Sequence, residues 1–126
     1  MTKPLVSIIT PCYNGEAFLK RYFESILNQT YPNLELIFIN DGSTDRTEEI
    51  ALSYRERLEK RGITYIYEKQ ENAGQAAALN RGLKLFTGEY LTWPDSDDEM
   101  VSDAVEKKVD YLEGTLIRKG KKKKKN

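Results

Sequence analysis

Four short segments of the chain combine β-branched and aromatic residues and are mostly bounded by turn formers. They are Leu5–Thr10, Leu34–Asn40, Ile63–Glu68 and Glu89–Trp93. This composition is typical of β-strands. The first two segments are nearly continuous apolar runs, as in parallel strands that are covered on both faces. The pattern therefore predicts a parallel sheet between layers of helices.

Helical periodicity occupies the stretches between and after these strands. It predicts helices over residues 15–29, 45–62 and 73–88, and a fourth from Ser102 to about Leu112. Asp45 and Glu48 stand at capping-box spacing, and Gly62 suits the position just after a helix end. Alternating strands and helices predict right-handed βαβ crossovers in a three-layer α/β/α fold with a mainly parallel sheet. Such sheets bind ligands beyond the carboxyl ends of their strands, at the topological switch point.

The formal net charge of zero hides two unlike parts of the chain. The last nine residues, "RKGKKKKKN", hold seven of the 20 basic groups and no acid, so residues 1–117 carry a net charge of −7. The 126 residues suffice for one domain. We expect a folded unit over residues 1–113 and a basic, disordered tail over 114–126. Attraction of this tail to anionic membrane stays open, whereas no specific nucleic-acid partner is expected, because no aromatic residues stand among the lysines.

Cysteine and histidine usage narrows the chemistry. Cys12 is the single cysteine and there is no histidine, so a disulfide within the chain, a conventional zinc site and a histidine-based triad are excluded. Any metal must be a hard, oxygen-bound ion such as Mg²⁺ or Mn²⁺. No apolar run is long enough to span a membrane, and the N-terminal residues lack a secretory signal. We therefore expect a cytoplasmic protein, with peripheral attachment at the inner membrane surface left open.

Each predicted strand runs into a polar loop, and the four loops should meet at one edge of the sheet. The loops are Thr10–Gly15, Asn40–Asp45, Lys69–Asn80 and Trp93–Met100. Taken singly, each has a plain structural interpretation: "DGSTD" serves as a turn and helix cap, and Tyr13 as a core aromatic. The acidic run "DSDDE" could favour the start of the next helix, but that benefit of ~0.3–1 kcal/mol is too small to offset four adjacent carboxylates. A divalent ion that bridges carboxylates to a phosphate would offset them.

Taken together and in this order, the loops resemble a known family. "TPCYNG", "INDGSTD", "NAGQAAALNRGL" and "GEYLTWPDSDD" resemble the N-terminal, nucleotide-sugar-binding half of family 2 glycosyltransferases, over residues 4 to about 112. The resemblance implies a GT-A fold, Rossmann-like and three-layered, that is incomplete on its C-terminal side. It also implies an enzyme that transfers a sugar, with inversion, from a nucleotide-diphospho-sugar to an acceptor hydroxyl. A UDP-sugar is the expected donor; a glycan, a lipid-linked molecule and a protein all stay open as acceptor.

The resemblance also implies roles for matching positions at the nucleotide. Thr10, Pro11 and Tyr13 would form the wall under the base, with Tyr13 offering an aromatic face. Asp41 would accept a hydrogen bond from a base N–H. Asp95 would lie near the ribose and the metal.

Three further positions match the segment that approaches the diphosphate, namely Asn72, Gly74 and Asn80. Here Leu79 stands where one common version of the pattern has arginine, so a cationic phosphate contact would be missing or would come from Lys69 or Arg81.

The acidic run corresponds to the D-x-D element of the family. The implied ligands of Mn²⁺ or Mg²⁺ are Asp97, as the principal one, and Asp95, with Asp98 supporting the site. The metal would neutralise the diphosphate leaving group.

No catalytic residue is assigned, because the base and the acceptor site of the family are expected beyond the end of this chain. The later acids, among them Asp103 and Asp110, lie at helical spacing and suit a solvated face. The alternative function is therefore a nucleotide-binding module without transferase activity of its own. A nucleotidyltransferase fits less well, because "TPCYNGEAFL" lacks a glycine-rich basic phosphate loop. Exposed apolar surface at the missing side leads us to expect homodimerisation or marginal stability.

Overall fold

The strands form a single parallel sheet in the spatial order β3-β2-β1-β4. The computed structural model describes residues 3–94 and 100–119. Its strands are β1 (Val6–Cys12), β2 (Leu34–Asp41), β3 (Thr64–Gln70) and β4 (Tyr90–Thr92). All four predicted strands are confirmed, and so is the α/β class with its parallel sheet.

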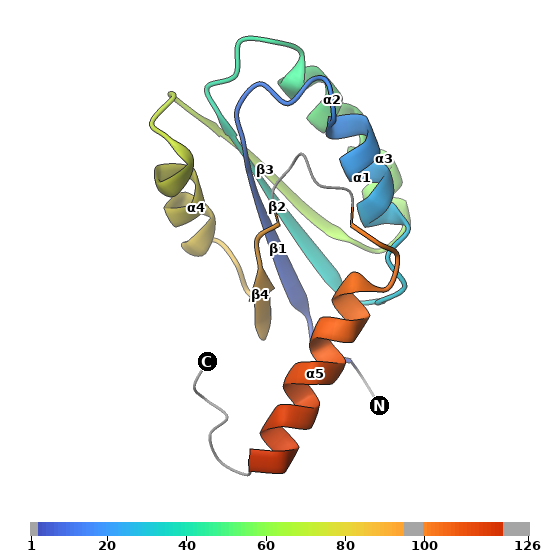
Figure 1. Ribbon diagram of the computed structural model, residues 1–126. Helices are drawn as coiled ribbons and strands as arrows, with labels where there is room; N and C mark the ends of the chain where they lie inside the picture. The colour runs from blue at the N-terminus through green and yellow to red at the C-terminus, as the bar shows by residue number, and fades with distance from the viewer. Residues whose placement is uncertain (1–2, 95–99, 120–126) are drawn as a thin grey trace.

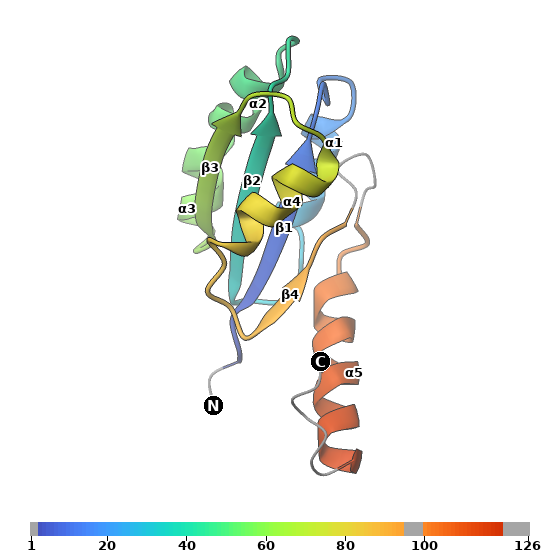
Figure 2. The same ribbon diagram turned by 90° about the vertical axis from the view of Figure 1, so that its left-hand side faces the viewer.

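Helices cover both faces of this sheet. In the described part of the chain they are α1 (Leu19–Leu27), α2 (Thr47–Ser53), α3 (Arg55–Lys60), α4 (Gln75–Leu83) and α5 (Ala104–Lys119). Figure 1 shows α1, α2 and α3 on one side of the sheet and α4 on the other, and Figure 2 looks onto the α4 face. The arrangement is the predicted three-layer α/β/α sandwich.

The alternation of side chains along the strands divides the core between the two faces. On the α1 face, Val6 and Ile8 of β1 and Phe38 of β2 belong to a large aromatic cluster. On the α4 face, Ile9 and Ile37 belong to a much smaller cluster. The α4 face is therefore the less covered of the two.

Helix α5 joins the larger cluster: its first turns lie beside the lower end of the sheet in Figure 1, and the rest of the helix extends beyond it. Its residues Val105 and Val109 are buried in the α1-face core. The buried side chain of Gln29 fixes its start: Gln29 Oε1 accepts a hydrogen bond from the Val105 N–H (3.1 Å), and Gln29 Nε2 donates to the Val101 carbonyl (2.8 Å). This docking returns the chain to the α1 face after β4.

The prediction of one helix over residues 45–62 was wrong, because α2 ends and α3 begins around Tyr54. The Tyr54 ring stacks on Phe23 of α1 with centroids 4.8 Å apart, and its hydroxyl donates to Glu24 (2.9 Å). Contacts with another helix thus hold Tyr54 at the break, and they are invisible in a local sequence pattern.

The bounds of three other helices differ from the predicted ones. Helices α1 and α4 are shorter than the periodic stretches 15–29 and 73–88, because their flanking residues form turns tied to neighbouring strands and loops. Helix α5 begins just after Ser102, as predicted, but runs to Lys119. It therefore continues past the predicted domain boundary at residue 113 and into the stretch expected to be a disordered tail; residues 120–126 lie outside the described part.

Candidate functional site

The loops that follow β1, β2 and β3 gather at one end of the sheet (Figure 1). We call residues 13–16, 42–46 and 71–74 the strand-end rim. The strand order reverses at β1, which has β2 on one side and β4, reached only after β3, on the other. This is the topological switch point, where ligands of open α/β sheets bind.

Asp41, the last residue of β2, fastens the third rim loop. It is 3% exposed, and its two carboxylate oxygens accept four hydrogen bonds. Oδ1 accepts from Gln70 Nε2 and from the Ala73 N–H, both at 2.9 Å. Oδ2 accepts from the Gly74 N–H at 3.0 Å and from Asn72 Nδ2 at 3.2 Å. One carboxylate therefore holds the whole approach to α4.

These contacts also set the charge state of Asp41. Burial acts to raise the pKa of its carboxyl, but the hydrogen bonds from Gln70 and from the backbone of Ala73 and Gly74 outweigh burial and lower it. The rim thus holds a fixed negative charge at neutral pH.

A glycine lets this loop approach β2. Gly42 has φ +70°, in the left-handed region, and a Cβ on it would lie 2.5 Å from the Asn72 backbone nitrogen. Any other residue at position 42 would push the 71–74 loop away from Asp41.

The first two rim loops are joined by hydrogen bonds between side chains and backbone. The Asn14 N–H donates to Ser43 Oγ (2.8 Å), and Asn14 Oδ1 accepts from the Thr44 N–H (2.8 Å). The Gly15 N–H donates to Thr47 Oγ1 (2.8 Å). The "GSTD" stretch thus binds the turn after β1, and its Asp45 Oδ1 also accepts the Thr47 N–H (2.9 Å) at the start of α2, where Arg46 is the N-cap and forms no side-chain cap.

The three residues predicted to line the base lie in different environments. Tyr13 is 51% exposed on the rim, which excludes its interpretation as a core aromatic. Pro11 is buried in β1. Thr10 is fully buried, and its hydroxyl forms a hydrogen bond with the Tyr22 hydroxyl on the α1 face. Its side chain therefore belongs to the core, so Thr10 could face a nucleotide only through its backbone.

The residues predicted at the diphosphate are split as well. Asn72 and Gly74 lie in the rim, and Gly74 caps α4 with φ +102°. Asn80 lies within α4 as an exposed residue, outside the rim loops. Its neighbour Leu79 packs on the α4-face cluster, so its side chain stabilises the fold.

Both cations considered as substitutes for the missing arginine already pair with carboxylates. Arg81 Nε lies 2.7 Å from Glu68 Oε1, and Lys69 Nζ lies 3.2 Å from Glu48 Oε1. These pairs are partly exposed, and such pairs contribute little to stability. Neither cation is preorganised for a phosphate.

The acidic run with Asp95, Asp97 and Asp98 lies outside the described residues. Within residues 3–94 and 100–119, no group of three or more acidic or cysteine side chains could hold a metal ion. The metal ligands expected from the sequence belong to that run, and carboxylate oxygens are ligands that suit Mg²⁺ or Mn²⁺.

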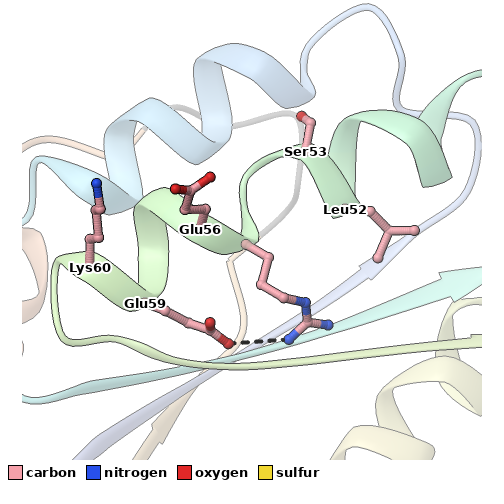
Figure 3. Close-up of a pocket in the computed structure, with 6 residues that line it drawn as sticks. Leu52, Ser53, Glu56, Glu59 and Lys60 are labelled. Atoms are coloured by element: carbon pink, nitrogen blue, oxygen red, sulfur yellow. Dashed lines mark hydrogen bonds and ion pairs between the residues drawn. The ribbon is translucent and has the colours of Figure 1, made fainter.

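A surface hollow of about 530 Å³ lies elsewhere, on the outer side of α2 and α3 (Figure 3). It is lined by Leu52, Ser53, Arg55, Glu56, Glu59 and Lys60. The ion pair drawn there joins Arg55 Nη1 to Glu59 Oε2 at 3.4 Å. None of the predicted site residues lines this hollow.

Sequence reasoning missed Gln70 as a partner of Asp41. The two residues are paired across β2 and β3 in the parallel register. The register depends on loop lengths and sheet twist, which the sequence does not show directly. The position of Gln70 near the end of its strand was the one available signal that it lies beside Asp41.

A family comparison decides the identity of this domain. The model of the family described as "Glycosyl transferase family 2" matches residues 7–116. The chain belongs to glycosyltransferase family 2. The predicted resemblance is confirmed.

Relatives and solved structures agree with this family 2 assignment. A Rickettsia typhi protein named as an uncharacterized glycosyltransferase is 45% identical over 109 residues, which cover 86% of this chain and 32% of the relative. The structure of S. aureus TarS 1–349 in complex with UDP has a TM-score of 0.77 at 26% identity and covers 86% of this chain and 32% of its own. The same fragment has also been solved with UDP-GlcNAc.

A second solved structure adds a metal. The Pyrobaculum calidifontis mannosyltransferase PcManGT, in complex with GDP-Man and Mn²⁺, has a TM-score of 0.68 at 32% identity and covers 76% of this chain and 28% of its own. These similarities confirm the GT-A class of fold. The family 2 chain described here spans about a third of the length of the first curated relatives it matches.

Proposed function

We propose that this chain is the donor-binding part of a glycosyltransferase and binds a nucleotide-diphospho-sugar, specifically a UDP-sugar. One observation carries the proposal: in a family 2 chain, the turn after β1 that holds Tyr13 and the loops after β2 and β3, which Asp41 ties together, lie at the same end of a parallel sheet. An exposed ring, a buried carboxylate and backbone near a helix start suit a base, a base N–H and a diphosphate respectively. The UDP and UDP-GlcNAc complexes of TarS support this choice of donor.

Asp41 can accept a base N–H without losing its hold on the loop. Three of its four hydrogen bonds come from Gln70 and from backbone N–H groups, at 2.9–3.0 Å. The fourth, from the exposed Asn72 side chain, is the longest at 3.2 Å. In this proposal the base N–H replaces this longest contact at Oδ2, while Asn72 Nδ2 keeps its hydrogen bond to the Asp41 backbone carbonyl (3.0 Å).

The proposed metal ligands are Asp97 and Asp95, with Asp98 in support, and the ion is Mn²⁺ or Mg²⁺. The Mn²⁺ complex of the mannosyltransferase supports the choice of metal. When bound, the ion would neutralise the charge that develops on the diphosphate leaving group. Lys69 and Arg81 each already pair with a carboxylate, so the proposal assigns this neutralisation to the metal ion.

Transfer with inversion to an acceptor hydroxyl is proposed for a longer protein of the size of the matched relatives, in which the base and the acceptor site would lie outside these 126 residues. The second candidate function, donor binding without transfer, applies to this chain alone. The observation that favours it is the chain's coverage of 32% of its Rickettsia relatives.

Calorimetric titration of UDP, with and without Mn²⁺, tests the donor site. We expect Mn²⁺-dependent binding that Asp97→Asn weakens strongly and Asp103→Asn, a matched change just before α5, leaves unchanged. GDP and dTDP serve as competitors for base preference. Absence of metal-dependent binding across all three nucleotides would contradict the proposal.

A turnover assay separates the two candidate functions. We expect this chain to bind UDP-sugar but to release no free sugar or UDP above the uncatalysed rate. Donor hydrolysis or sugar transfer by the chain alone would show that the binding-module description is wrong.

The location of the protein in the cell is part of this proposal. No helix among the described residues is long and apolar enough to cross a membrane. We propose a cytoplasmic location, with peripheral attachment to the membrane through the C-terminal lysines. Sedimentation with anionic vesicles at low and high salt would measure this attachment.

A further inference from the structure

The turn after β1 holds the one exposed aromatic ring of the strand-end rim. Tyr13 is followed by Asn14, which has φ +52° in the left-handed region. Gly15 comes next, and a Cβ there would lie 2.5 Å from Cys12 Sγ. The turn therefore has a narrow choice of conformations and needs contacts from outside to hold it.

Those contacts come from the loop after β2. Ser43 Oγ accepts the Asn14 N–H (2.8 Å), Thr47 Oγ1 accepts the Gly15 N–H (2.8 Å), and Asp45 Oδ2 accepts the Glu16 N–H (3.0 Å). Three successive backbone donors of the turn are thus bound by side chains at three alternate positions, two in the loop after β2 and the third, Thr47, at the start of α2. We call this arrangement the rim clasp, formed by Ser43, Asp45 and Thr47.

Side chains of the 13–16 turn also accept hydrogen bonds from the backbone of the loop after β2. Asn14 Oδ1 accepts the Thr44 N–H (2.8 Å), and Glu16 Oε1 accepts the Arg46 N–H (3.1 Å). Both loops therefore satisfy backbone groups of the other, which makes them one rigid unit.

A relay inside the clasp fixes the proton of the Thr47 hydroxyl. Thr47 Oγ1 donates to Asp45 Oδ1 (2.6 Å), which leaves an oxygen lone pair for the Gly15 N–H. Thr47 is fully buried, whereas Asp45 is partly exposed and its pKa is lowered by these hydrogen bonds, which outweigh the effect of burial. The carboxylate is therefore charged at neutral pH and keeps the hydroxyl oriented.

We propose that Ser43, Asp45 and Thr47 are positioning residues, which hold the 13–16 turn so that the Tyr13 ring forms a preset platform for the nucleobase. The inference rests on the proposed donor site. The same loop begins directly after Asp41, so the clasp joins the stacking partner of the base to its hydrogen-bond partner. A ring already held in place loses less freedom when the nucleotide binds, which favours affinity.

A double-mutant cycle on UDP affinity, measured by calorimetry with Mn²⁺, tests the clasp. Ser43→Ala should weaken UDP binding about tenfold, because one clasp hydrogen bond contributes roughly this factor. In a Tyr13→Ala background the same change should alter affinity by less than about twofold. Ser43→Thr keeps the hydroxyl and should restore binding, and Ser53→Ala, whose hydroxyl bonds within α2, is the matched control.

A ligand without a nucleobase distinguishes loss of the Tyr13 platform from a general disturbance of the fold. Inorganic pyrophosphate with Mn²⁺ should bind wild type and Ser43→Ala equally, since it does not use Tyr13. Amide hydrogen exchange should show faster exchange at Asn14 in Ser43→Ala and at Gly15 in Thr47→Val, with the β2 amides still protected.

Two results would overturn the inference while leaving the donor site intact. One is equal weakening of UDP binding by Ser43→Ala in the wild-type and Tyr13→Ala backgrounds; the other is no weakening in either. If wild type fails to bind UDP at all, both the donor site and the clasp are refuted.

Discussion

At the scale of single residues, Asp41 is the group on which the candidate site depends most. Asp41→Asn would replace one carboxylate oxygen by an NH₂ group, which would face either the donors of Gln70 and Ala73 or those of Asn72 and Gly74. We expect a loss of about 1–3 kcal/mol in the free energy of unfolding at pH 7, and at least about tenfold weaker UDP binding. Urea unfolding and calorimetry would measure the two effects. Asp110→Asn, at an exposed position of α5, should change stability by less than about 0.5 kcal/mol.

The pH dependence of this difference has a definite sign. The pKa of Asp41 in the folded chain lies below its ordinary value of 3.8. Its contribution to stability is therefore complete above that value and is lost as the pH falls through the lower, folded pKa. The stability gap between wild type and Asp41→Asn should narrow in acid below about pH 3.8. A gap that widens there would contradict the assignment of the lowered pKa.

Residue roles were only partly predictable from the sequence. The rim position of Asp41 follows from its place at the end of an apolar strand, a local signal. The core position of Thr10 does not, because alternation places its hydroxyl against Tyr22, which lies on a helix whose packing the sequence leaves open. The clasp of Ser43 and Thr47 with the 13–16 turn joins two loops about 30 residues apart, beyond the reach of a turn pattern.

At the scale of elements, two glycines offer a matched comparison. Gly42 (φ +70°) and Gly62 (φ +90°) both have left-handed backbone, but a Cβ at Gly42 would lie 2.5 Å from the Asn72 nitrogen, whereas one at Gly62 has nothing within 4 Å. Gly62→Ala should cost only the backbone strain, about 1–2 kcal/mol. Gly42→Ala should cost more in thermal or urea unfolding and should also weaken UDP binding, because the 71–74 loop must move. Equal stability losses with equal UDP affinity would contradict this role of Gly42.

The other end of β2 carries a second buried carboxylate, which fixes the connection from α4 to β4. Glu35 Oε1 accepts from Ser7 Oγ (2.6 Å) and from the Thr87 N–H (2.9 Å), and Ser7 Oγ accepts the Gly88 N–H (2.9 Å). Glu35→Gln should lower the free energy of unfolding by about 1–3 kcal/mol. Glu56→Gln, exposed on α3, is the control, and a cycle with Ser7→Ala should show strong coupling. Additive effects of Glu35→Gln and Ser7→Ala would contradict the network.

Elements were more predictable than their ends. All four strands were predicted, because apolar β-branched runs bounded by turn formers are a local property of the sequence. The division of residues 45–62 into α2 and α3 was not, because Tyr54 is held at the break by Phe23 and Glu24 of another helix.

At the scale of the whole molecule, the two faces of the sheet are unequally covered. Three helices and part of α5 pack on one face, whereas α4 alone covers the other in the described part of the chain (Figures 1 and 2). Gly82 lets α4 lie close to Ile9, because a Cβ at position 82 would be 2.5 Å from an Ile9 methyl carbon. Even so, α4 covers only a small part of this face. Leu85, Phe86 and Leu91 beside it are only partly buried.

This imbalance predicts how the isolated chain behaves. Trp93 after β4 is 52% exposed and Tyr111 on α5 is 70% exposed, so large apolar side chains face solvent at separate places. Together with the partly buried Phe86 and Leu91 on the thinly covered α4 face, they favour self-association, so we expect a homodimer or, failing that, a low thermal midpoint. Light scattering after size exclusion across a concentration series would measure the first, and calorimetric melting the second. Trp93→Ser with Tyr111→Ser should shift the chain toward monomer, whereas Leu52→Ser, an exposed change on α2, should not. A monomer with a sharp, high melting transition would contradict the prediction, since it would show that the α4 face needs no further cover.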